Sequence, residues 1–275
     1  MSALASVPGA VLLVGAGKMG GALLESWLAR GLPPALVSVI DPSPAPDVAK
    51  VLASKRIARD PQPPLLPTHA AVVLAVKPQM APLVMPQIAR FVGRDTVVVS
   101  IMAGKTLGFL AKHLPKGTAV VRAMPNTPAA IGRGITVAVP NGRVKSGARD
   151  LADALLAATG PVEWIKNETW MDAVTAVSGS GPAYVFLLAE SLARAGTAAG
   201  LPKALAARLA RETVAGAGEL LHRSELEAAK LRENVTSPGG TTAAALKILM
   251  GRSGLDPLMK KAVAAATKRS RQLAG

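Results

Sequence analysis

The first 165 residues alternate between short apolar runs and longer stretches in which hydrophobic and polar positions are mixed. Five near-continuous apolar runs predict buried strands, at residues 10–15, 36–40, 70–76, 96–101 and 118–122. Strands of this kind are typical of a parallel sheet that helices cover on both faces. A mixed stretch at 18–30 predicts a covering helix, and a sixth apolar run at 135–139 predicts a further strand. The pattern therefore predicts an α/β domain with a doubly wound sheet.

Strand patterns end near residue 166, and the rest of the chain has the character of helices separated by Gly or Pro. The predicted helices cover residues 184–199, 203–221, 226–233, 241–250 and 255–273. Their content of Ala, Leu, Val and Arg favours the helical state. Because 275 residues are many for one hydrophobic core, we predict two domains, an α/β domain at 1–165 and an all-α domain at 166–275. Apolar stripes on several helices predict that the second domain dimerises.

The net charge of +15 raises the question of nucleic-acid binding. Residues 1–165 hold 17 basic and 8 acidic residues, a net charge of +9, and residues 166–275 hold 15 and 9, a net charge of +6. The excess is spread over both halves, and no basic run or aromatic-interleaved patch concentrates it. We therefore expect no nucleic-acid partner, and a generally basic surface suits an anionic substrate and cofactor.

Other features of composition exclude further classes of protein. The chain contains no Cys, which rules out disulfides and thiol catalysis, and no apolar run approaches the length of a bilayer span. The apolar N-terminus lacks a basic start and runs directly into a glycine motif, so we do not interpret it as a signal peptide. No cluster of His and acidic residues has metal-ligand spacing. We expect a cytoplasmic protein with no membrane partner and no metal.

A glycine motif follows the first predicted strand and opens the first predicted helix, with Gly15, Gly17 and Gly20 in a GxGxxG pattern. Gly15 permits a tight turn, Gly17 lets a pyrophosphate approach the backbone, and Gly20 lets helix and strand pack closely. The motif alone is weak evidence. Its position between strand and helix, about twenty residues before an acid, makes it a dinucleotide-binding fingerprint.

That acid is Asp41, at the end of the second predicted strand. A carboxylate there can accept hydrogen bonds from both ribose hydroxyls of NADH and would repel the 2′-phosphate of NADPH. The alternative is a turn residue that caps Pro42 and Ser43. Since Ser43, Lys55 or Arg56 could still receive a phosphate, Asp41 favours NADH without excluding NADPH.

Two further loops follow predicted strands, where open α/β sheets bind ligands. One is Ala75-Val76-Lys77-Pro78, in which Lys77 lies either beside the cofactor ribose or in solvent. The other spans residues 124–128 and offers Asn126 as a contact to the cofactor.

The sequence SPGGTT at 237–242 has the character of a helix start that binds an anion. We expect Ser237 as the N-cap and Pro238 at the first helical position. Gly239 and Gly240 would let a ligand come close to the unpaired first-turn N–H groups, to which Thr241 and Thr242 add hydroxyls. An ordinary capped helix with solvated hydroxyls is the alternative.

A third motif, VSGSGPAY at 177–184, places small residues and a Pro at a helix start. Small residues there allow the close approach of a flat group. A simple hinge between helices is the alternative interpretation.

Taken together, these segments resemble pyrroline-5-carboxylate reductases. The resemblance lies in GAGKMGGAL, AVKPQ, RAMPNTPA, AVSGSGPAYVF at 176–186 and ENVTSPGGTT at 233–242, which follow the family's order over essentially the whole chain. The last two are specific to the family. The resemblance implies a Rossmann domain followed by a helical dimerisation domain. It also implies an NADPH- or NADH-dependent enzyme that reduces 1-pyrroline-5-carboxylate to L-proline, the final step of proline biosynthesis.

The resemblance further implies roles for particular residues. Those implied to contact the cofactor are Gly15, Ala16, Gly17, Lys18, Met19, Gly20, Ala75, Val76, Lys77, Pro78, Ile101, Met102, Ala103 and Asn234. Those implied to hold the substrate carboxylate or line its site are Ser237, Gly239, Gly240, Thr241, Thr242, Thr175 and Glu168. Met102 and Lys105 depart from the smaller or apolar residues usual in the family, and the proline-rich stretch at 60–67, an expected surface loop, is also atypical.

Thr242 is our candidate to hydrogen-bond the ring nitrogen of a bound imine. Threonine is a poor acid, so we expect it to orient the substrate or relay a proton that comes from solvent or a protonated substrate. A 2- or 3-hydroxyacid dehydrogenase would need a charged acid or base such as Lys or His in its substrate site, and the motifs of the helical half contain neither Lys nor His. A non-catalytic dinucleotide-binding regulator would have no use for SPGGTT. We expect a homodimer, or an assembly of dimers, with each site completed across the interface.

Overall fold

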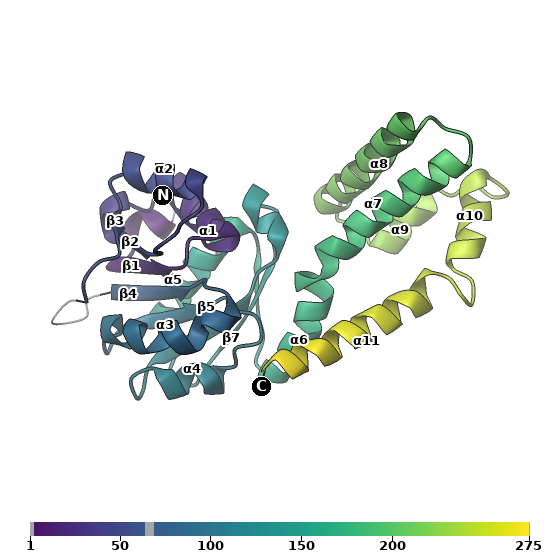
Figure 1. Ribbon diagram of the computed structural model, residues 1–275. Coiled ribbons are helices and arrows are strands. Elements are labelled where there is room, and N and C mark those ends of the chain that lie inside the picture. Colours follow the sequence, from purple (N-terminus) through teal and green to yellow (C-terminus); the bar gives the residue numbers. More distant parts are fainter. Residues whose placement is uncertain (1–2, 64–68, 275) are drawn as a thin grey trace. The chain divides into compact units, whose positions relative to one another are not determined.

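The computed structural model describes residues 3–63 and 69–274 (Figure 1). The chain forms two compact units, one of residues 1–179 with 267–275 and one of residues 180–266. The predicted boundary at 165/166 stays a prediction.

In the first unit, the described residues form one eight-stranded sheet in the order β3-β2-β1-β4-β5-β6-β7-β8. The strands are β1 (Ala10–Val14), β2 (Val37–Ile40), β3 (Ala58–Arg59), β4 (His69–Leu74), β5 (Val97–Ser100), β6 (Ala119–Met124), β7 (Thr136–Pro140) and β8 (Val162–Trp164). All neighbouring pairs are parallel except β6 and β7. The first six follow the strand order of a dinucleotide-binding fold, so the predicted Rossmann-type sheet is confirmed.

Helices cover both faces of this sheet (Figure 1). They are α1 (Lys18–Ala29), α2 (Pro46–Ser54), α3 (Ala81–Ile88), α4 (Leu107–His113), α5 (Ser146–Leu156) and the short α6 (Met171–Val174). Alternate residues of the strands point to opposite faces of the sheet and pack into two hydrophobic cores. Val11 and Val73 pack with Trp27 of α1, whereas Leu12 and Val72 pack with Met85 of α3. A strand with apolar residues on both faces is therefore near-continuously apolar in sequence.

The six predicted strands are all present, and two short ones were missed. β3 has two residues and β8 has three, too few for a recognisable pattern. The π-helix at Thr175–Gly179, just before α7, was not predicted either. The described part of the proline-rich stretch, residues 60–63, is irregular, and residues 64–67 lie outside the described residues.

The second unit is helical, as predicted. Its helices are α7 (Gly181–Ala198), α8 (Lys203–Arg223), α9 (Ala228–Asn234), α10 (Thr241–Leu249) and most of α11 (Leu255–Ala274). α7 and α8 lie side by side, and small residues permit their close approach: a Cβ on Gly196 would lie 3.2 Å from the Cβ of Ala206. Among the described residues, no helix is long and apolar enough to cross a membrane.

Candidate functional site

The glycine motif forms a tight loop between β1 and α1. Gly15 has a φ of +93°, and a Cβ there would lie 2.8 Å from the backbone of Ala75. A Cβ on Gly20 would collide with the carbonyl oxygen of Gly15. Gly17, the N-cap of α1, faces open space. Gly15 and Gly20 therefore hold strand and helix together, and Gly17 exposes its backbone to a ligand.

Beside this loop lies a pocket of about 520 Å³, at the carboxyl ends of β1, β4, β5 and β6. Every residue that lines it belongs to the first unit. The pocket brings together these residues of the predicted cofactor set: Gly17, Lys18, Met19, Ala75, Val76, Lys77, Pro78, Ile101, Met102, Ala103 and Asn126. Gly15, Ala16 and Gly20 support the loop without lining the pocket. The site occupies the point between β1 and β4 where the strand order reverses, the usual ligand site of an open α/β sheet.

Four lining residues, Met124, Pro125, Thr127 and Gly179, were not among the predicted contacts. The first three belong to the predicted loop at 124–128. Gly179 belongs to the VSGSGPAY motif, and a Cβ on it would lie 2.5 Å from the Cε methyl of Met124. The end of the π-helix thus packs directly against the pocket wall, and π-helical turns frequently occur at functional sites.

Asp41 faces the glycine loop at the end of β2. Its Oδ2 accepts a hydrogen bond from the Ala16 N–H at 2.6 Å, and its Oδ1 accepts one from the Ser43 N–H at 2.8 Å. The second bond is the turn contact that we considered as the alternative. Each carboxylate oxygen keeps capacity for another donor, so the turn role and a contact to the ribose are compatible.

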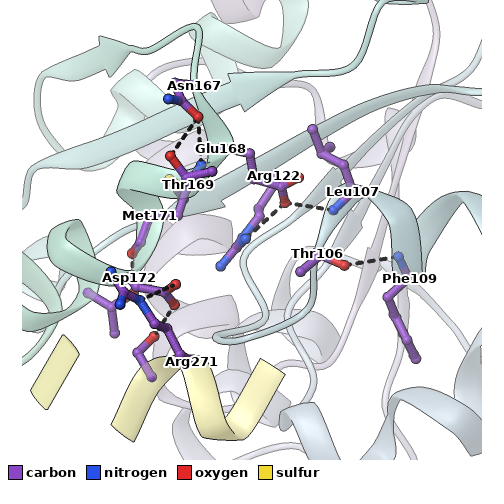
Figure 2. Close-up of polar contacts among 12 residues, drawn as sticks. Thr106, Leu107, Phe109, Arg122, Asn167, Glu168, Thr169, Met171, Asp172 and Arg271 are labelled. Carbon is purple, nitrogen blue, oxygen red and sulfur yellow. Dashed lines mark hydrogen bonds and ion pairs between the residues drawn. The ribbon is translucent and has the colours of Figure 1, made fainter. Parts of the chain in front are cut away.

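Glu168 joins two elements of the first unit (Figure 2). Its Oε1 accepts hydrogen bonds from Arg122 Nη1 and from the Leu107 N–H, each at 2.8 Å. The Arg122 side chain is 6% exposed and that of Glu168 is 28% exposed. Glu168 therefore caps the start of α4 and neutralises a buried guanidinium. Arg122 was not predicted as a site residue, because it belongs to the apolar run at 118–122, which indicates only a strand.

Thr175, the other residue implied to line the substrate site outside SPGGTT, is partly buried at the start of the π-helix. Its Oγ1 donates a hydrogen bond to the Met171 carbonyl at 2.8 Å. Among the departures from the family, Met102 lines the pocket and is almost fully buried, whereas Lys105 places its amino group 4.7 Å from the ring centre of Phe109.

The SPGGTT segment belongs to the second unit and forms a turn followed by α10. The prediction that Ser237 is the N-cap and Pro238 the first helical residue is wrong. Gly239 adopts a φ of +70°, which a right-handed helix cannot accommodate, so the chain turns with the Gly240 N–H donating to the Ser237 carbonyl at 3.0 Å. Gly240 is the N-cap, and the helix begins at Thr241 as the predicted range of 241–250 requires.

The start of α10 retains unpaired donors. Among the described residues, the first backbone hydrogen bond of this helix runs from the Ala244 N–H to the Gly240 carbonyl, so the N–H groups of Thr241, Thr242 and Ala243 are available. No acidic residue lies in the first turn. Thr242 is half-buried, and Asn234, the last residue of α9, is exposed. Within the residues that the structure describes, no group of three His, Asp or Glu side chains could hold a metal ion.

Comparison with known proteins agrees with this description. A family model for pyrroline-5-carboxylate reductase dimerisation matches residues 168–273, and one for NADP oxidoreductases (coenzyme F420-dependent) matches residues 10–104. Pyrroline-5-carboxylate reductase of Pseudomonas aeruginosa is 38% identical over 96% of each chain, and that of Synechocystis is 44% identical over 74% of each. The chain belongs to the pyrroline-5-carboxylate reductase family.

Solved structures give the same answer. A pyrroline-5-carboxylate reductase from Coxiella burnetii is 32% identical, with a TM-score of 0.88 and coverage of 97% of this chain and 99% of that one. A pyrroline carboxylate reductase from Plasmodium falciparum, solved with NADP bound, is 28% identical, with a TM-score of 0.81 and coverage of 98% and 99%. The resemblance found in the motifs thus extends over the whole fold.

Proposed function

We propose that this protein reduces 1-pyrroline-5-carboxylate to L-proline with NADPH or NADH. The observation that carries the proposal is the pocket at the carboxyl edge of the sheet, which gathers eleven of the residues predicted from motifs far apart in sequence, three of them from the glycine loop. The substrate is inferred from the relatives, which are pyrroline-5-carboxylate reductases. The SPGGTT turn of the second unit offers N–H groups and hydroxyls that suit a small carboxylate.

The first unit provides a cradle for a nicotinamide dinucleotide. Gly17, where a Cβ would meet nothing within 4 Å, opens the start of α1 to the pyrophosphate, which the positive end of the helix favours. Ala75–Pro78, Ile101–Ala103 and Asn126 would contact the rest of the cofactor. The bound cofactor supplies the hydride, and the protein's contribution is to hold the reacting groups in line.

The second unit provides the anchor for the substrate. The free N–H groups at the start of α10 lie at the positive end of its dipole, where a carboxylate binds favourably. Gly239 and Gly240 keep this turn free of side chains, and Ser237, Thr241 and Thr242 add hydroxyls. Glu168 and Thr175 complete the proposed substrate set. A bound carboxylate would fix the position of the imine carbon.

Thr242 is the proposed catalytic contact to the ring nitrogen. Replacement by Val keeps the shape of the side chain and removes the hydroxyl, so we expect Thr242→Val to lower kcat about 100-fold while cofactor binding stays near that of the unaltered protein. Steady-state kinetics with calorimetry of NADPH binding would measure both. Thr197→Val, which removes an exposed hydroxyl from α7, is the matched control. An unchanged kcat in Thr242→Val would remove Thr242 from the mechanism.

We also propose that NADH serves at least as well as NADPH. The Asp41 carboxylate, held by Ala16 and Ser43 at the end of β2, supports this proposal because a 2′-phosphate beside it would be repelled. The ratio of kcat/KM for the two cofactors decides the point. A strong preference for NADPH that survives Asp41→Ser would show that the acid plays no part in selection.

The proposed working unit is a cytoplasmic homodimer, or an assembly of dimers, with each substrate site completed across the interface. Its support is the dimerisation model matched over residues 168–273 and the apolar helix faces that a single chain leaves exposed. Such interfaces commonly bury about 2,000 Å² or more.

The decisive experiment gives purified protein NADH or NADPH with 1-pyrroline-5-carboxylate, and records both cofactor oxidation and the formation of proline. Parallel reactions of 2- and 3-hydroxyacids with NAD⁺ or NADP⁺ test the dehydrogenase alternative, in which the cofactor would be reduced. Oxidation of cofactor only with the imine is the expected result. Cofactor binding without turnover of any of these substrates would instead indicate a binding protein.

A further inference from the structure

The edge strand β3 places two charged residues beside the end of β2. Val39 pairs with Arg59 in the parallel register, and the Asp60 N–H donates to the Val39 carbonyl at 2.7 Å. Arg59 and Asp60 therefore leave the sheet at its carboxyl edge, next to Asp41. The two-residue β3 has no recognisable pattern in the sequence, so neither residue was predicted to lie beside Asp41.

Arg59 and Asp60 hold the backbone of Asp41 from two sides. Asp60 Oδ1 accepts a hydrogen bond from the Asp41 N–H at 3.0 Å. Arg59 Nε donates to the Asp41 carbonyl at 3.2 Å, and Nη2 donates to the Pro42 carbonyl at 2.8 Å. An ion pair of 3.2 Å joins Arg59 Nε to Asp60 Oδ2. The guanidinium is thus engaged by three oxygen atoms of its own chain.

This cluster lies at the end of β2, where the fold would place the part in which the two nicotinamide cofactors differ. In dinucleotide-binding folds the acid at the end of the second strand meets the ribose that carries the 2′-phosphate of NADP. Here that acid is Asp41. The side chains of Arg59 and Asp60 are 44% and 45% exposed, so both are accessible to a ligand beside it.

We propose that Asp60 is a specificity-determining residue for the cofactor, an inference that rests on the proposed function. Its carboxylate keeps the Arg59 guanidinium turned onto the loop and adds a second negative charge to that of Asp41. The carboxylates of Asp41 and Asp60 outnumber the single guanidinium of Arg59, so this cluster has a net negative charge that disfavours a 2′-phosphate. Without the Asp60 charge, the guanidinium can turn its planar fork to the phosphate, the geometry that Arg prefers.

The test is Asp60→Asn, which removes the charge and retains an oxygen to accept the Asp41 N–H. Asp60 has a φ of +47°, and Asn tolerates this left-handed region as well as Asp does. We expect the affinity for 2′,5′-ADP, measured by calorimetry, to rise about tenfold, while that for 5′-AMP changes by less than about threefold. The kcat/KM ratio of NADPH to NADH should rise about tenfold as well.

Two further variants make the result specific. Asp95→Asn removes the same charge at the amino edge of the sheet, before β5, and should leave 2′,5′-ADP binding unchanged. Asp60→Asn combined with Arg59→Gln should lose the gain, because the gain depends on the released guanidinium. Asp60→Gly, which also removes the carboxylate and adopts a φ of +47° without strain, is expected to give the same shift and replaces the Asn variant if that variant does not fold.

Equal 2′,5′-ADP affinity in the folded Asp60 variant and the unaltered protein would overturn the proposal, as would a gain that persists without Arg59. Nucleotide binding does not require reduction of an imine. Failure of the protein to reduce 1-pyrroline-5-carboxylate would therefore contradict the proposed function. The measurement of 2′,5′-ADP binding would still test the role of Asp60.

Discussion

The two units bury hydrophobic residues in opposite ways. In the first, strand residues such as Val11, Val72 and Val98 are completely buried between the sheet and its helices. In the second, Phe186 of α7 is 63% exposed and Ile248 of α10 is 75% exposed. In α7, which the structure describes in full, no residue is buried, and the buried residues of α8 are Ala206 and Ala210. The first unit closes a core of its own, and the second presents apolar surface that another chain can cover.

The same contrast extends to polar groups. In the first unit, the buried Arg122 finds Glu168 and the indole N–H of Trp27 donates to the Leu155 carbonyl at 2.7 Å. In the second unit, ion pairs join exposed residues three or four positions apart on the same helix, such as Glu190 with Arg194 and Glu219 with Arg223. Pairs of that kind contribute little to stability. These exposed ion pairs therefore do little to fix the helices of the second unit.

The largest expected effect comes from placing a charge on the exposed face of the second unit. Phe186→Asp would bury an unpaired carboxylate in the proposed dimer interface, at a cost of roughly 4 kcal/mol in association, or about 1,000-fold in the dimer dissociation constant. Sedimentation should then show monomers, and the reductase activity should be lost in parallel.

The control for this variant lies in the first unit. Leu83 of α3 is 64% exposed, nearly the same as Phe186, and does not line the pocket at the carboxyl edge of the sheet. Leu83→Asp should leave both the assembly and the activity near those of the unaltered protein. An active Phe186→Asp monomer would show that activity does not require the exposed apolar face of the second unit to be covered by another chain. The proposed contrast between the two units would then be wrong.

A smaller effect is expected where the first unit pairs a buried charge. Glu168→Gln would leave the Arg122 guanidinium without a counter-charge and weaken the cap of α4, for a loss of about 2 kcal/mol in the free energy of unfolding. Part of the Glu168 side chain reaches solvent, so the loss should stay below that of a fully buried pair. Urea denaturation measures it.

Glu163→Gln on β8 is the matched control, because Glu163 is exposed and forms no ion pair with any residue that the structure describes. It should change the unfolding free energy by less than about 0.5 kcal/mol. Equal losses in the two variants would show that the contact of Glu168 with Arg122 does not stabilise the unit.

The smallest effect concerns His69, at the start of β4. Burial lowers the pKa of its imidazole, and a backbone hydrogen bond at Phe91 opposes the shift in part. The unfolded chain therefore binds a proton more readily, so stability should fall as the pH drops below about 6.5 and level off beneath the folded-state pKa. For one group the slope cannot exceed about 1.4 kcal/mol per pH unit.

His69→Phe keeps a ring at the position where the imidazole meets Phe91 edge-on, with ring centres 5.8 Å apart. The variant should lose less stability between pH 7.5 and pH 5 than the unaltered protein does. Parallel pH profiles of the two proteins would contradict the assignment to His69.

Elements that a local pattern encodes were predicted well. The strands that line the cofactor edge and the helices of the second unit were all found, because each spans enough residues to show its periodicity. The two-residue β3 and the three-residue β8 carry no periodicity, and they form because neighbouring strands offer them hydrogen bonds. The misplaced cap at Ser237 has a related cause, since only the backbone angle of Gly239 decides where α10 can begin.

The sequence by itself determined the nucleotide-binding fold and most of the pocket wall, because the glycine loop and the strand ends lie beside short, characteristic motifs. Tertiary structure alone decided which distant charges meet. Arg122 finds Glu168 46 positions away, and Arg59 and Asp60 reach Asp41 through an edge strand. The physical reason is that backbone propensity and apolar periodicity are local, whereas hydrogen bonds and ion pairs between distant side chains exist only once the sheet has set their positions.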